Sequence, residues 1–82
     1  MVKVVEVIQE LQAGGFMNSD RSARARILKS LSDGAITCQL DDTVRGVNLP
    51  EGPFFHQDEA LAAIRTYWER CNEKLEGGGH WL

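Results

Sequence analysis

The chain has 82 residues, of which 43% are hydrophobic and 26% charged, and its formal net charge is −3. This apolar content is too high for a disordered chain, and the length supports one small core rather than two. We therefore expect a single domain over residues 1–76 and a glycine-rich tail over residues 77–82. The acidic balance argues against a surface built as a whole to coat nucleic acid or anionic lipid.

Cysteine usage and apolar run lengths indicate the compartment. The two cysteines allow at most one disulfide bridge, which is far from a disulfide framework. The first seven residues, MVKVVEV, lack the apolar run and cleavage pattern of a signal peptide. No segment approaches the ~20 apolar residues that a membrane span requires. We expect a soluble, cytoplasmic protein that does not contact a membrane.

The first two expected elements are helices. On a helical wheel, residues 2–12 place Val4, Val5, Val7, Ile8 and Leu11 in one arc, and Gly14-Gly15 follows as a stop. The β-branched run also fits a strand, but its apolar residues do not alternate cleanly, so the pattern favours a helix. A second helix is expected from about residue 19 to about residue 32, after three N-cap candidates and before Asp33-Gly34.

The middle of the chain changes to a period of two residues. Ile36, Cys38 and Leu40 share one face, which predicts a strand. Asp41-Asp42 has turn chemistry, and residues 43–49 are expected to form the return strand of a β-hairpin. The stretch from Pro50 to Pro53 excludes regular structure.

The last expected helix runs from about residue 58 to residue 76, because its apolar side chains recur along one broad arc. The predicted fold class is therefore a small α+β domain in the order α-α-β-β-α, with an antiparallel hairpin packed on a long C-terminal helix. Two strands alone are marginal in water. The hairpin must therefore lie on the last helix, gain a further strand or pair with a second copy, and a homodimer is one expected partner arrangement.

Catalytic and metal-binding side chains form no recognisable motif. Cys38, His56, Cys71 and His80 include no C-x-x-C or H-x-x-x-H pair, and we interpret the two cysteines as small buried hydrophobes. The serines lack a base partner and a glycine-flanked nucleophile turn. The sequence therefore predicts no enzyme activity, no cofactor and no metal.

Basic residues gather in the segment expected to form the second helix. Residues 1–34 carry a net charge of +1, whereas residues 35–82 carry −4. We predict that four basic side chains form a partner-binding face: Arg21, Arg24, Arg26 and Lys29. The alternative is an ordinary solvated helix face whose cations pair with acidic residues elsewhere.

The C-terminal tail ends on Trp81 and Leu82 after three glycines. Trp81 either folds back over an edge of the small core or serves as an exposed anchor for a partner, since tryptophan is a preferred hot-spot residue. We include Trp81 among the candidate partner-binding residues.

A resemblance to a group of known proteins adds to these observations. The hairpin segment ITCQLDDTVRGVNL and the helical segment PFFHQDEALAAIRTYWERCNEKL resemble small α+β accessory proteins encoded by bacteriophages, anti-CRISPR proteins among them. The resemblance implies a non-enzymatic protein that inhibits a host or defence complex by binding its surface. The alternative function is a small winged-helix-like DNA-binding transcriptional regulator, with residues 19–32 as recognition helix and 35–49 as wing. We expect a host protein or complex as the partner ahead of nucleic acid.

Overall fold

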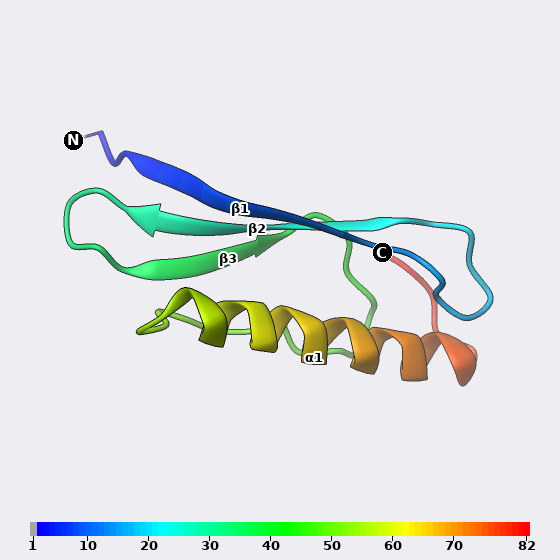
Figure 1. The fold of residues 1–82 in the computed structure, drawn as a ribbon. Coiled ribbons are helices and arrows are strands. Elements are labelled where there is room, and N and C mark those ends of the chain that lie inside the picture. Colours follow the sequence, from blue (N-terminus) through cyan, green and yellow to red (C-terminus); the bar gives the residue numbers. More distant parts are fainter. Residues whose placement is uncertain (1) are drawn as a thin grey trace.

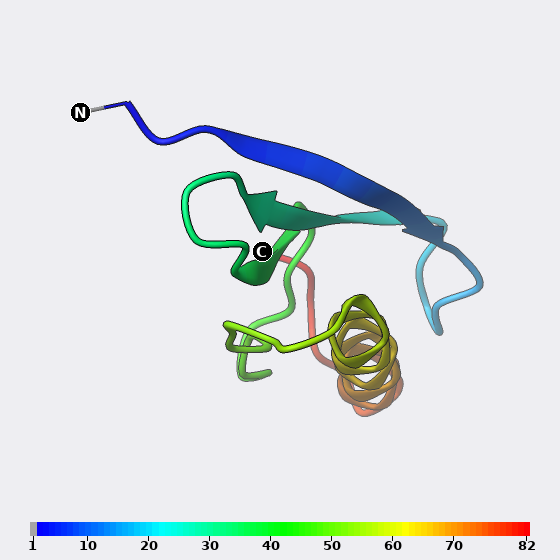
Figure 2. The same cartoon turned by 60° about the vertical axis from the view of Figure 1, so that its left-hand side comes forward.

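A computed structural model describes residues 2–82 and shows a sheet covered on one side by a helix. Strands β1 (Val5–Ala13), β2 (Ala23–Ser30) and β3 (Ile36–Leu40) form an antiparallel sheet in the order β1-β2-β3. Helix α1 (Gln57–Glu76) lies along one face of this sheet (Figures 1 and 2). The α+β class is confirmed, but the order is β-β-β-α, with one helix among the described residues.

The helix expected over residues 2–12 is wrong, because this segment forms β1. A bulge explains the misleading pattern: Val7 pairs with Leu28 and Gln9 pairs with Ile27, so Ile8 is an additional residue. Before the bulge, odd-numbered side chains point away from α1; after it, Leu11 lies opposite the buried Ala25 and points toward α1. The bulge interrupts the two-residue period of the apolar side chains, and their remaining spacing resembles that of an amphipathic helix.

The helix expected over residues 19–32 is also wrong, because residues 23–30 form β2. The side chains of Ala23, Ala25 and Ile27 are fully buried beneath α1, whereas Arg24 and Arg26 alternate with them on the other face. Alanine has the highest helix propensity, yet here it occupies the core positions of a central strand. Tertiary packing overrides that local preference.

Strand β3 confirms the period-two prediction, but its partner differs from the expected one. Residues 43–49 form no strand, so the hairpin over 36–49 is wrong. Strand β3 pairs with β2 instead, with Cys38 opposite Ile27 and Leu40 opposite Ala25. The β2–β3 turn contains Gly34 at a φ of 74°, and the Ala35 N–H donates to Asp33 Oδ1 at 2.9 Å.

Helix α1 confirms the last expected element and holds the core together. It buries a regular stripe of side chains against the sheet: Ala60, Ile64, Tyr67, Cys71 and Leu75. Ala60 and Ile64 pack with Ala25 and Ile27, and the later residues of the stripe pack with Phe16, Ala23 and Val44. The core is therefore one layer of side chains between α1 and a single sheet face.

The segments after the strands return to cover the ends of this layer. Phe54 bridges to Ile36 at the β3 edge and packs on the core, whereas Phe55 is 88% exposed. Trp81 bridges to Val44, and the Leu82 N–H donates to the Thr43 carbonyl at 2.9 Å. Over residues 2–82, no helix combines the length and apolarity that a membrane crossing requires.

Candidate interaction surface

The sheet face opposite α1, which we call the open face, carries two of the four basic side chains singled out in the sequence, Arg24 and Arg26. No helix or strand of residues 2–82 lies over it (Figure 2). Strand register assigns its side chains: Arg24 lies opposite Gln12, and Arg26 lies between Glu10 and Gln39. The open face therefore presents two arginines on the central strand, flanked by polar side chains on both neighbours.

Arg26 is held in place by its neighbours on the β3 side. Its Nη2 lies 2.7 Å from Asp41 Oδ1, and its Nε donates a hydrogen bond to Gln39 Oε1 at 3.3 Å. All three side chains are partly or largely exposed, so we expect the ion pair to contribute less than about 1 kcal/mol to stability. Its main effect is to orient the guanidinium.

Arg24 differs from Arg26 because its guanidinium has no partner of this kind. Within residues 2–82, the ion pairs are those of Arg21 with Asp42 and of Arg26 with Asp41. The Arg24 backbone N–H donates to Asp42 Oδ2 at 3.2 Å, which fixes the main chain and leaves the exposed side chain free. Arg24 thus offers an unpaired cation on a rigid strand.

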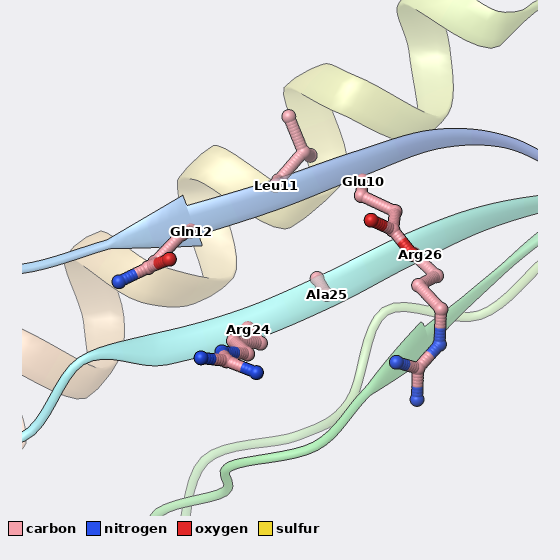
Figure 3. Close-up of a pocket in the computed structure, with 6 residues that line it drawn as sticks. All are labelled: Glu10, Leu11, Gln12, Arg24, Ala25 and Arg26. Carbon is pink, nitrogen blue, oxygen red and sulfur yellow. The ribbon is translucent and has the colours of Figure 1, made fainter.

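A shallow hollow lies over the paired strands β1 and β2 on the open face. It has a volume of about 250 Å³ and is bounded by two pairs of facing side chains, Glu10 with Arg26 and Gln12 with Arg24 (Figure 3). In Figure 3 the side chains of these four residues stand on the viewer's side of the strands, while Leu11 points toward the helix. Leu11 and Ala25 contribute backbone to the floor, because their side chains point toward α1 and leave the hollow open between the long polar side chains.

Arg21 and Trp81 meet beside one end of the sheet. The Arg21 guanidinium carbon lies 5.2 Å from the centre of the Trp81 ring, and its Nη1 lies 3.6 Å from Asp42 Oδ1. Trp81 packs edge-on against Phe16, with 5.1 Å between the ring centres, and its Nε1 donates a hydrogen bond to Ser19 Oγ at 2.9 Å. Trp81 therefore folds back and completes the core, with part of its surface left exposed.

Lys29 is separated from the three arginines. It lies opposite Glu6 and Ile36 near the far end of β2 and shares the face of Ile27 and Ala25, so it does not belong to the open face. The structure thus brings together Arg24 and Arg26, places Arg21 with Trp81 beside them through Asp42, and leaves Lys29 apart. The four residues do not form one helical face.

The sequence reasoning missed an apolar area at the other end of the open face. Val5 and Val7 lie opposite Ser30 and Leu28, on the same side as Arg24, and both valines remain about half exposed. Predicting a strand with a bulge at Ile8 would have placed Val5 and Val7 on one face, because they lie two residues apart before the bulge. The open face therefore has a polar half with the arginines and an apolar half with the valines.

The remaining candidate side chains stay separate from this surface. Cys38 and Cys71 are free thiols, and burial raises the pKa of each. His56 occupies the N-cap position of α1 without a side-chain capping hydrogen bond. Among residues 2–82, no three His, Cys, Asp or Glu side chains gather closely enough to hold a metal ion.

Comparisons of the chain with protein-family models, with curated proteins and with solved structures found no match. Function is therefore inferred from the geometry of the open face.

Proposed function

We propose that this protein is a non-enzymatic interaction module that binds a macromolecular partner, in the first place a protein, through the open face of its sheet. The observation that carries the proposal is the exposed, unpaired guanidinium of Arg24 on the central strand, beside the oriented guanidinium of Arg26. The backbone of a central strand is ordered before binding, so few backbone degrees of freedom are lost on association.

The chemistry of the open face indicates the kind of surface that it would bind. Guanidinium groups present several donors in a planar fork that matches carboxylates, and arginine is enriched among interface hot spots. The polar half therefore suits a partner segment with acidic side chains, and the Val7 and Leu28 half suits an adjoining apolar contact. Within this proposal, the resemblance to phage accessory proteins suggests that binding blocks a host or defence complex.

A DNA-binding regulator is the alternative function. Residues 19–32 hold no helix, and residues 35–49 hold one strand rather than a winged hairpin, so the recognition helix and wing are not formed. The open face also alternates cations with Glu10 and Asp41, which is unfavourable for a phosphate backbone. We therefore keep nucleic acid as an outcome of the test below.

The test compares partner recovery by two charge-reversal variants. Arg24→Glu alters the open face, and Arg65→Glu alters the exposed side of α1 as a matched control. Affinity capture from host cells, with and without nuclease, is quantified by mass spectrometry after circular dichroism confirms folding. We expect Arg24→Glu to lower recovery of a nuclease-resistant partner by about tenfold or more, as for an arginine hot spot.

Two outcomes would contradict the proposal. Equal recovery of every captured protein by Arg24→Glu and wild type would remove the open face as the binding surface. Recovery that disappears on nuclease treatment and falls steeply with added salt would favour the nucleic-acid alternative.

A further inference from the structure

The start of β1 and the residues just before it, 2–7, form a sheet edge with apolar side chains. The order β1-β2-β3 leaves β1 with a strand on one side only (Figure 2). Four valines are exposed along this short segment: Val2, Val4, Val5 and Val7. Natural edge strands are usually protected by charges, prolines or bulges, because unpaired backbone groups attract further strands. Here the bulge at Ile8 interrupts the strand after this segment, and residues 2–7 have Lys3 and Glu6 alone as charged residues.

Backbone directions identify which groups of this edge are free. The Val4 carbonyl points toward β2, since it accepts a hydrogen bond from the Leu31 N–H at 3.1 Å. Successive residues of an antiparallel strand direct their N–H and C=O groups to opposite sides. Lys3, Val5 and Val7 therefore direct theirs to the outer side of β1, where residues 2–82 place no strand.

We propose that this edge pairs antiparallel with the same edge of a second copy of the chain, around a two-fold axis at Val5. In this register Val5 lies opposite Val5 of the second copy, and Lys3 lies opposite Val7. All of these residues direct their N–H and C=O groups outward, so the pairing satisfies the free groups of both copies. This interface goes beyond the proposed function and does not depend on it.

Charge and the bulge select this register among its neighbours. A two-fold axis perpendicular to the sheet keeps each side chain on its own face, so paired residues always share a face. One residue therefore pairs with its own copy at the axis, and the choice of that residue defines the register. Centring the axis on Glu6 would place two carboxylates directly opposite each other, which is unfavourable. Centring it on Val7 would extend the ladder into the bulge at Ile8. Centring it on Val4 would pair Lys3 with Val5 and leave the outward groups of Val7 without a partner among residues 2–82. Val5 is the position that avoids all three problems.

A second copy also suits the side chains beside this edge. The two-fold axis brings the Val5 side chains of the two copies together, with Val7 and Leu28 of each copy beside them and Lys3 at the two margins of this apolar area. The sheet grows from three strands to six, and the short edge is closed. The ladder is small compared with that of a permanent dimer, so we expect the dimer fraction to rise with protein concentration.

Amide hydrogen exchange on the full chain tests the pairing residue by residue. With increasing concentration, the amides of Lys3, Val5 and Val7 should become protected, because the second copy covers them. The Glu6 amide points toward β2 and should show little change. Exchange at Val5 and Val7 that is fast and independent of concentration, in a chain that sediments as a monomer throughout, would overturn the proposal.

A matched pair of variants provides the second test. Val5→Lys places two ammonium groups opposite each other at the axis, whereas Leu49→Lys alters a similarly exposed side chain away from β1 (50% and 54% exposed). Sedimentation should show that Val5→Lys raises the dimer dissociation constant by roughly tenfold or more, while Leu49→Lys leaves it unchanged. A dimer that persists in Val5→Lys with free exchange at Val7 would place the contact elsewhere and contradict the proposal.

Discussion

Arg24 and Arg26 illustrate how two identical side chains on one strand acquire different roles. Both project from β2 onto the open face, but Asp41 and Gln39 orient Arg26, whereas the Arg24 guanidinium has no ion-pair partner among residues 2–82. The sequence predicted that these residues lie on a contact surface. It could not predict their separation from Lys29, because that depends on strand alternation rather than helical periodicity.

The first residue-scale prediction concerns Trp81. Trp81→Ala should lower the free energy of unfolding by about 2–3 kcal/mol, since it removes the edge-on contact with Phe16, the hydrogen bond to Ser19 and the bridge to Val44. Urea unfolding followed by circular dichroism measures the change, with the exposed His80→Ala as control. A loss no larger than that of the control would show that Trp81 does not close the core.

The second residue-scale prediction concerns the alkaline stability of the fold. Burial, with a smaller contribution from the Cys71 thiol, raises the pKa of Tyr67 from 10.0 to about 12. Tyr67 ionises earlier in the unfolded chain than in the folded one, so its stabilising contribution is complete below pH 10 and is lost as the pH rises toward about 12. The raised pKa values of Cys38 and Cys71 act in the same direction.

Tyr67→Phe should reduce this alkaline loss without abolishing it, because the two thiols remain. At neutral pH it should change the free energy of unfolding by less than about 1 kcal/mol, since the Tyr67 hydroxyl is buried without a hydrogen-bond partner of standard geometry among residues 2–82. Thermal unfolding of both proteins at neutral pH and at about pH 11 measures the difference. Identical losses in both proteins would assign the alkaline transition to other groups.

At the scale of elements, the sequences of β1 and β2 carry local patterns that are typical of helices. The bulge at Ile8 changes the phase of β1, and the alanines of β2 occupy buried positions although they favour helices. Strand β3 and helix α1 have regular periods and were predicted correctly. The hairpin partner of β3 was misassigned because residues 19–32 were predicted as a helix, so the short connection over residues 31–35 was not recognised as a hairpin turn.

The element-scale prediction concerns the turn between β2 and β3. Gly34 has a φ of 74°, in the left-handed region, and an added Cβ would meet no atom within 4 Å. Gly34→Ala should therefore cost about 1–2 kcal/mol of backbone energy alone. Gly77→Ala, where φ is −83°, serves as control and should cost less. Equal costs in urea unfolding would indicate that the β2–β3 turn tolerates another backbone conformation.

At the scale of the whole molecule, one layer of side chains between α1 and a single sheet face leaves the other face open. The sequence indicated a small α+β domain with apolar residues beyond its main elements, and the structure divides those residues. Phe54 and Trp81 pack on the core, whereas Phe55 and the valines of β1 remain exposed. Which residues complete the core and which stay exposed depends on tertiary pairing, so the open face could not be derived from local patterns.

Site-specific photo-cross-linking in host cells shows whether a partner protein contacts the open face. A photoreactive amino acid replaces Gln12 on the open face or Thr66 on the exposed side of α1, and both positions are solvent-exposed. Our account predicts that the Gln12 position yields a cross-linked partner protein and that the Thr66 position does not. Cross-links from Thr66 alone would place the partner on the helix side and contradict the account.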